Sequence, residues 1–190
     1  LDGADEMSKY VDALLVINNE RLSEIYSDLT FLNAFGKADD TLTIAARSIS
    51  ELITGEGYIN LDFNDVDTTL RNGGAAIISS GYGEGENRVS KAFDEALKSP
   101  LLKNRDIMKS KKLLFNIYFS DEAEQPFAMS ETKEITAFVS GINEGVDIIW
   151  GATIDKSLGN KVKITILAAG FDMELRDSRE IETKEGIRKL

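Results

Sequence analysis

One long apolar stripe constrains the fold of this chain more than any other feature. Apolar residues recur at alternating steps of four and three, the spacing of one helix face: Phe31, Phe35, Ala38, Leu42, Ala45, Ile49 and Leu52. Thr30 precedes the stripe as a candidate N-cap, and Gly55 follows it as a stop signal. We predict a helix over about residues 30–54, roughly 36 Å long at about 1.5 Å per residue. Ile44 and Ile53 widen its apolar surface, so we expect protein on more than one side.

Strand and helix patterns interleave along the rest of the chain. Apolar runs or alternation predict strands at 11–17, 75–80, 112–119 and 162–169, with a more mixed pattern at 146–154. Helical patterns occupy residues 20–26, 66–72, 86–98 and 130–142. This interleaving predicts an α/β fold, in which a four-stranded sheet with helices on one face follows the long central helix. Residues 172–190 are mostly charged and are predicted to form a flexible tail.

Composition excludes several classes of protein. The net charge of −11 argues against direct contact with nucleic acid or an anionic membrane, because both are bound through clustered Lys and Arg. The chain has no cysteine and no histidine, which removes disulfides, thiolate metal sites and the commonest general base. Its longest apolar runs fall well short of the roughly 20 residues that span a bilayer.

Residues 57–66 carry the densest group of candidate functional side chains, which are those of Asn60, Asp62 and Asp65. The two carboxylates lie three residues apart where a helix is predicted to begin, so they can face the same way. Carboxylates in that position can cap the helix, bind a cation or polarise a water for attack. The residues alone leave these roles open, including an acid–base or metal pair in a small α/β enzyme.

A glycine-rich segment at residues 81–85 superficially matches a dinucleotide-binding loop. That fingerprint is Gly-x-Gly-x-x-Gly between a strand and a helix, and here the third glycine falls one residue early. Glu84 and Glu86 would also repel a pyrophosphate. We therefore interpret this segment as a structural turn.

The segment that begins at Asn60 resembles a loop of the FtsZ family, the tubulin-like GTPases of bacterial cell division. Residues 60–66 differ from the family's usual Asn-Leu-Asp-Phe-Ala-Asp-Val only at Asn64. Further similarities follow in the family's order: Val-Asp-Ala-Leu-Leu-Val-Ile at 11–17, Asn-Glu-Arg-Leu at 19–22, Ala-Phe-Gly-Lys-Ala-Asp-Asp at 34–40, Gly-Tyr-Gly-Glu-Gly-Glu-Asn-Arg at 81–88 and Ser-Pro-Leu-Leu at 99–102. The similarity runs from about residue 10 to residue 171.

The resemblance implies a division of the chain. Residues 1–54 would be the C-terminal remnant of a nucleotide-binding domain plus the central helix at about 30–54. Residues 55–171 would be the family's C-terminal assembly and GTPase-activation domain, and residues 172–190 the charged tail. The family's phosphate loop, Gly-Gly-Gly-Thr-Gly-Thr-Gly, does not occur in these 190 residues. The chain is thus expected to be a C-terminal portion that binds no nucleotide by itself.

The resemblance also implies roles for five residues. Asn60, Asp62 and Asp65 would enter the GTP pocket of the neighbouring subunit and position the attacking water. Phe35 would stack on the guanine of the chain's own GTP, and Asp39 would accept hydrogen bonds from its edge. The cofactor would be GTP with Mg²⁺ in the full-length protein, and no metal site is expected within this chain.

Partners and location follow from the same resemblance. The expected partner is the protein itself, in a head-to-tail homopolymer. Cell-division accessory and membrane-anchor proteins would bind through regions mostly absent here, and the protein would act in the cytoplasm, in the ring at mid-cell. As an alternative, the chain serves only as a non-catalytic self-assembly module.

Overall fold

The computed structural model describes residues 2–15, 30–55, 57–98 and 107–171. The predicted helix at 20–26 and the predicted tail at 172–190 lie outside these ranges. The described helices are α1 (Asp2–Met7), α3 (Phe31–Thr54), α4 (Phe63–Leu70), α5 (Arg88–Leu97) and α6 (Thr132–Ser140). The strands are β1 (Ala13–Leu15), β2 (Gly57–Ile59), β3 (Gly74–Gly83), β4 (Lys112–Phe119), β5 (Asp147–Ile154) and β6 (Val162–Phe171).

The strands form one mixed sheet in the order β1-β3-β6-β4-β5-β2. The α/β prediction is confirmed, but the sheet has six strands where four were predicted. The four central strands are the predicted ones. The two additional strands, β1 and β2, lie at the edges and have three residues each. Strand β2 was not predicted, because three residues are too few to display a strand pattern of their own. β1 falls within the predicted strand at 11–17 and pairs in parallel with β3.

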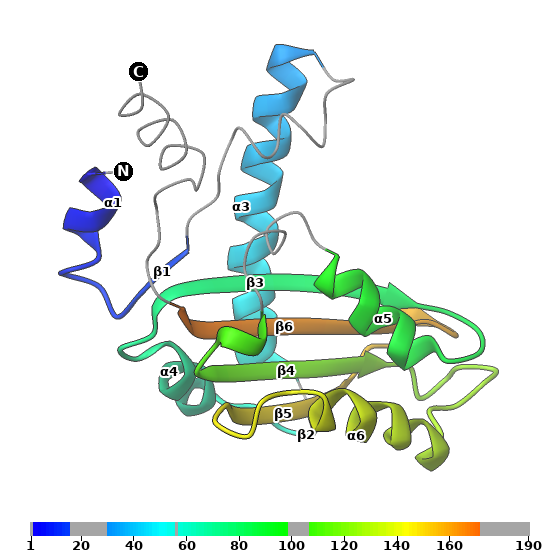
Figure 1. The fold of residues 1–190 in the computed structure, drawn as a ribbon. Helices are drawn as coiled ribbons and strands as arrows, with labels where there is room; N and C mark the ends of the chain where they lie inside the picture. Colours follow the sequence, from blue (N-terminus) through cyan, green and yellow to red (C-terminus); the bar gives the residue numbers. More distant parts are fainter. Residues whose placement is uncertain (1, 16–29, 56, 99–106, 172–190) are drawn as a thin grey trace, which may run out of the picture.

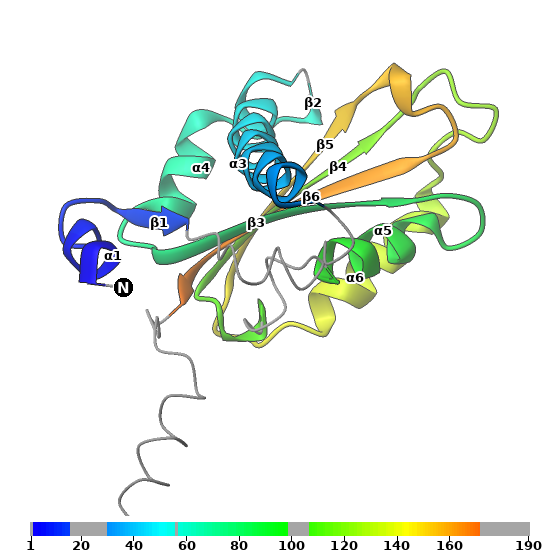
Figure 2. The same cartoon turned by 90° about the horizontal axis from the view of Figure 1, so that it is seen from above.

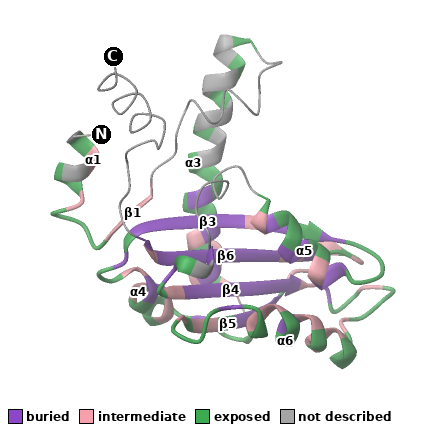
Figure 3. Cartoon of the chain, in the orientation of Figure 1, coloured by how far each residue is buried: buried purple, intermediate pink, exposed green. Residues whose placement is uncertain are grey.

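Helices cover both faces of the sheet (Figure 2). Helices α5 and α6 lie on one face, where Phe93, Phe115 and Phe138 pack together in the larger core cluster. Helices α3 and α4 lie on the other face, over a smaller cluster that includes Leu114 and Leu167. The prediction of helices on one face alone is therefore wrong, because α3 and α4 also pack on the sheet. Figure 3 shows the central strands as the most buried part of the molecule.

The long helix α3 has the predicted ends, with Thr30 as its N-cap and Gly55 as its C-cap. Its C-terminal half packs on the sheet, whereas its N-terminal half projects away from it (Figure 1). Accordingly Leu52 is 2% exposed, while Leu42 and Ile44 are 57% and 59% exposed. Within the ranges that the structure describes, no helix combines the length and apolar character needed to cross a membrane.

Two glycines of the glycine-rich segment lie inside β3 and not in a turn, which corrects the sequence interpretation. A Cβ at Gly81 would lie 2.3 Å from the Ala92 carbonyl oxygen of α5. A Cβ at Gly83 would lie 1.7 Å from the Arg88 carbonyl oxygen. These glycines are needed because the backbone of α5 packs directly on the strand, a use of strand glycine that the sequence pattern does not distinguish from a turn.

Replacing Gly83 with alanine is expected to destabilise the domain by about 3 kcal/mol, because the added methyl group would displace the first turn of α5. Urea unfolding of the variant and the native chain measures the difference. Gly85 offers a matched control, since its φ of +71° strains any other residue but a Cβ there meets no atom within 4 Å. A loss at Gly83 no larger than that at Gly85 would contradict the close packing of α5.

Arg88 links three of the loops between secondary-structure elements at one end of the sheet. Its side chain is buried, and its Nε and Nη2 donate to the Glu131 carboxylate at 2.7 and 2.9 Å. Its remaining N–H groups donate to the backbone carbonyl oxygens of Gln125, Pro126 and Asn160. Burial raises the pKa of Glu131, but hydrogen bonds from Arg88 and from the Ala128 N–H outweigh it and leave the pKa below its ordinary value.

Candidate functional site

Residues 57–65, called the connection below, comprise β2, the link to α4 and the first turn of α4. The connection runs along the edge of the sheet as β2 and then packs on the face that carries the smaller core cluster. Its strand β2 pairs with β5, with Gly57 opposite Thr153 and Ile59 opposite Ala152. Leu61 is buried in the smaller core cluster. A Cβ at Gly151 would lie 2.6 Å from Leu61 Cγ and 2.9 Å from the Ile59 carbonyl oxygen. The connection thus lies directly against β5, and Gly151 makes room for it.

The three predicted site residues of this connection lie together, and each makes a local hydrogen bond. Asn60 Oδ1 accepts from the Gly57 N–H at 2.7 Å, across the register shift in β2. Asp62 is the N-cap of α4 and accepts from the Asp65 N–H at 3.1 Å. Asp65 accepts in return from the Asp62 N–H at 2.9 Å. The two carboxylates therefore form a capping box, the first of the three roles that their spacing allowed.

The capping box leaves the site open to a ligand or another protein. Asp62, Asn60 and Asn64 are exposed, and Asp65 is half-buried. Two large side chains of the same segment are exposed as well, with Tyr58 at 81% and Phe63 at 68%. Each carboxylate uses one oxygen in the box. A carboxylate has about four lone-pair sites on two oxygens, so both groups retain capacity to accept from a water.

Phe35 and Asp39 lie elsewhere, in the N-terminal half of α3. The Asp39 side chain is exposed, and the Phe35 side chain lies outside what the structure describes. Sixteen residues separate Asp39 from Gly55, a distance of roughly 24 Å along the helix axis. The structure therefore brings together Asn60, Asp62 and Asp65. It places Phe35 and Asp39 toward the opposite end of α3.

Two lysines that the sequence analysis did not identify contact the helices on either side of the connection. Lys163 of β6 donates to Glu51 of α3 at 2.8 Å. Lys112 of β4 donates to the Thr68 carbonyl oxygen of α4 and to that of the C-cap residue Arg71, at 2.7 and 2.9 Å. Burial raises the pKa of Glu51, but its hydrogen bonds with Lys163 and Arg47 and their charges outweigh this and hold the pKa below its ordinary value.

The described residues offer no cluster of three or more His, Cys, Asp or Glu side chains that could hold a metal ion. Asp62 and Asp65 are only two carboxylates, and each accepts a hydrogen bond from a backbone N–H group. The arrangement is suited to accepting hydrogen bonds from a water or from another protein.

Comparison with known proteins identifies the family of this chain. Residues 74–172 match the family model of the FtsZ family, C-terminal domain. A cell division protein FtsZ of Porphyromonas gingivalis is 55% identical over 188 residues, which are 99% of this chain and 39% of that protein. The solved empty FtsZ dimer of Methanocaldococcus jannaschii superposes with a TM-score of 0.74 at 36% identity, over 89% of this chain and 48% of that one.

A more distant structure shares the fold alone. TubZ of Bacillus thuringiensis serovar israelensis, solved as a protofilament, superposes with a TM-score of 0.70 at 14% identity, over 94% of this chain and 49% of that one. The chain therefore spans half or less of the length of each relative. The family model, the identity across nearly the whole chain and the structural match agree, and the chain belongs to the FtsZ family of tubulin-like cell division proteins.

Proposed function

We propose that this chain is the C-terminal part of a GTPase that polymerises head to tail, and that Asn60, Asp62 and Asp65 activate GTP hydrolysis in the adjacent subunit. Residues 1–54 would complete a nucleotide-binding domain and provide the central helix. Residues 55–171 would form the assembly and activation domain. The observation that carries the proposal is the position of the two carboxylates, which cap an exposed helix start in a segment that also exposes the rings of Tyr58 and Phe63.

The capping box supports this proposal, because it orients the groups that would act on water. Phosphoryl transfer depends mostly on positioning and on the placement of charge, and an attacking water needs an acceptor aligned with the bond that breaks. The backbone N–H groups of Asp62 and Asp65 hold one oxygen of each carboxylate. The other oxygen of either group would accept a proton of the water in the neighbour's pocket. Capping and activation of water are then two uses of the same side chains.

The separation of the two sets of residues also favours a shared site. Asp39 lies roughly 24 Å along α3 from the connection that contains Asp62. Subunits stacked head to tail would bring the connection of one subunit, with Asp62 and Asp65, to the nucleotide held near Asp39 of the next. The exposed Asp39 carboxylate fits guanine, whose N1–H and N2 amine are both donors. Phe35 would stack on the base, and GTP with Mg²⁺ would be held mainly by residues outside this chain.

Partners and location belong to the same proposal. The protein would assemble with itself and bind accessory and membrane-anchor proteins of division through other regions, in the cytoplasmic ring at mid-cell. The 190-residue chain alone would then act as a self-assembly module without catalysis. The exposure of Leu42 and Ile44 on α3 favours such association, since exposed apolar surface promotes contacts between chains.

The 190-residue polypeptide is expected to show no GTP binding at micromolar concentrations. It contains the proposed base-binding residues but no phosphate loop, and backbone cradles for phosphates supply much of nucleotide affinity. Isothermal titration calorimetry measures this directly. Adding the N-terminal half of the protein is expected to produce GTP binding and turnover. Micromolar binding by the polypeptide alone would contradict the proposal, and so would a lack of turnover by the two halves when they form a complex.

A further inference from the structure

The residues proposed to act on the neighbour's GTP lie on a connection whose direct support is limited. Gly57 and Ile59 pair with β5 at the edge of the sheet, and Leu61 is buried against it. The remaining residues from Tyr58 to Asn64 are exposed. The position of the carboxylates therefore depends on how firmly the ends of α3 and α4 are held against the sheet.

The C-terminal part of α3 is held by an ion pair with the sheet. Lys163 Nζ lies 2.8 Å from Glu51 Oε2, and the two side chains are only 14% and 30% exposed. The same ammonium group lies 4.9 Å from the centre of the Tyr118 ring, which is buried. Partly desolvated charges interact more strongly than surface pairs, so this contact is stronger than the surface pair between Lys156 and Glu122.

The C-terminus of α4 is held by a second lysine. Lys112 Nζ donates to the Thr68 and Arg71 carbonyl oxygens, which belong to the last turn and the C-cap of the helix. The last carbonyl groups of a helix lack partners within it and carry partial negative charge, so a lysine at this end satisfies and stabilises them. The capping box fixes the first turn of α4, and Lys112 fixes the last.

Strand alternation places both lysines on the face that carries the connection. Residues an even number of positions apart on a strand lie on the same face of the sheet. Lys112 therefore shares the face of Leu114 on β4, and Lys163 shares the face of Leu167 on β6. In the register between these strands, Lys163 lies opposite Tyr118, six residues from Lys112. The two lysines are thus about 20 Å apart at opposite ends of one face. The connection runs along the sheet edge beside β5, between the two helices that these lysines hold.

We propose that Lys112 and Lys163 are positioning residues that together fix the connection carrying Asn60, Asp62 and Asp65. Lys163 sets the end of α3, and Lys112 sets the axis of α4, so the two carboxylates are held in one orientation relative to the sheet. The catalytic part of this inference rests on the proposed function. Its structural part concerns this chain alone and can be measured without GTP.

Hydrogen exchange on the 190-residue chain tests the structural part. The amides of Gly57, Asp62 and Asp65 each donate to a side chain of the connection. Changing Lys112 or Lys163 to methionine is expected to accelerate exchange of residues 57–65 about three- to tenfold, while exchange in β3 and β6 is unchanged. Arginine at either position keeps the charge and the donors, and is expected to restore protection.

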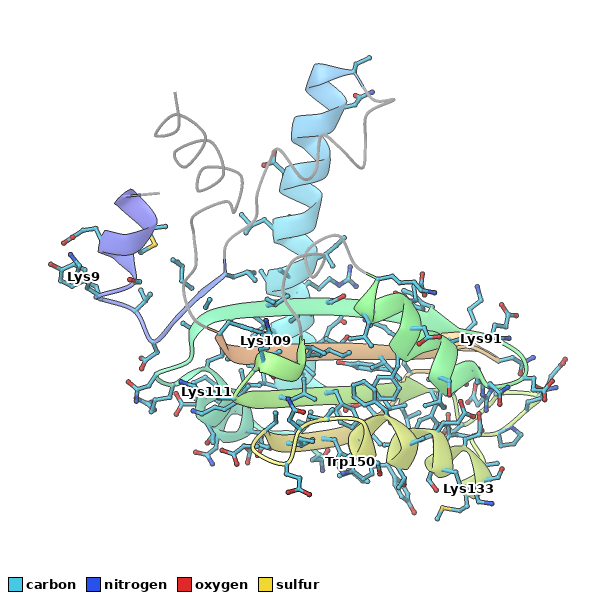
Figure 4. The ribbon with its side chains drawn as sticks, viewed as in Figure 1. Lys9, Lys91, Lys109, Lys111, Lys133 and Trp150 are labelled. Carbon is cyan, nitrogen blue, oxygen red and sulfur yellow. The ribbon has the colours of Figure 1, made fainter. Side chains whose placement is uncertain are left out.

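Neighbouring lysines provide matched controls. Lys111 precedes β4, is exposed and is labelled in Figure 4, and Lys161 is exposed and 3.9 Å from Glu84. Lys111→Met and Lys161→Met are expected to leave exchange of residues 57–65 unchanged. If the Lys112 and Lys163 variants matched these controls, or if they accelerated exchange equally throughout the domain, the inference would be overturned.

Turnover by the full-length protein tests the catalytic part. Lys112→Met and Lys163→Met are expected to lower kcat about tenfold at unchanged GTP affinity, and arginine is expected to restore kcat. Normal kcat in both variants, alongside a large loss in Asp62→Ala, would overturn the positioning role and leave the proposed function intact. Normal kcat in Asp62→Ala would overturn the proposed function and with it the catalytic part, whereas the exchange result would still decide the structural part.

Discussion

Replacing Asp62 or Asp65 with alanine in the full-length protein is expected to reduce GTP turnover about a hundredfold while leaving GTP binding intact. Loss of a group that positions the attacking water removes about 3 kcal/mol of transition-state stabilisation. Polymers should still form and should persist longer, because disassembly follows hydrolysis. Steady-state phosphate release measures GTP turnover, and light scattering of the same sample measures how long the polymers persist.

The capping box provides the competing expectation for these variants. If Asp62 and Asp65 served only as caps, alanine would lower stability by about 1 kcal/mol and leave turnover per polymer nearly unchanged. Asp62→Asn is the matched control, because asparagine caps helices about as well as aspartate but carries no charge. Turnover in Asp62→Asn close to that of the native protein would contradict the catalytic role.

Replacing Arg88 with methionine is expected to destabilise the domain by about 3 kcal/mol. Arg88 is buried, so its loss leaves Glu131 without its ionic partner and three backbone carbonyl groups without their donor. Urea unfolding of the native and variant chains measures the difference. A second change, Glu131→Gln, should recover part of the loss by removing the unpaired charge. A loss below about 1 kcal/mol would show that Arg88 does not hold together the loops that contain Glu131 and Asn160.

The same ion pair gives the native chain a defined response to acid. The pKa of Glu131 in the folded chain lies below its ordinary value near 4.5, so its contribution to stability is present above that value. The contribution is lost as the pH falls through the folded-state pKa, because the protonated carboxyl no longer pairs with Arg88. The stability of Arg88→Met should therefore fall less steeply than that of the native chain below about pH 4.5.

The elements with strong local signals were predicted correctly from the sequence. The apolar stripe, with Thr30 before it and Gly55 after it, located both ends of α3. Edge strand β2 was missed because it has three residues and forms only through pairing with β5, far along the chain. Gly81 and Gly83 were interpreted as a turn because a Gly-x-Gly pattern does not distinguish a turn from a strand on which a helix packs closely.

The candidate site was predictable only where its contacts are local. The capping box between Asp62 and Asp65 spans three residues, so their spacing suggested it. The supporting contacts are not local, since 112 residues separate Lys163 from Glu51 and 44 separate Lys112 from Thr68. Such pairs have no signature in a single sequence. The roles of Phe35 and Asp39 stay predictions, because a nucleotide-binding half would have to complete their site.

Complementation between two inactive variants tests the shared site most directly. One subunit would carry Asp62→Ala and Asp65→Ala with an intact nucleotide pocket, and the other would keep both carboxylates but carry a pocket unable to bind GTP. Each protein alone should hydrolyse GTP at the low residual rate. Mixed polymers should regain turnover, because the connection of one subunit acts on the GTP held by the next. Copolymers that form normally but stay at the residual rate would contradict the account.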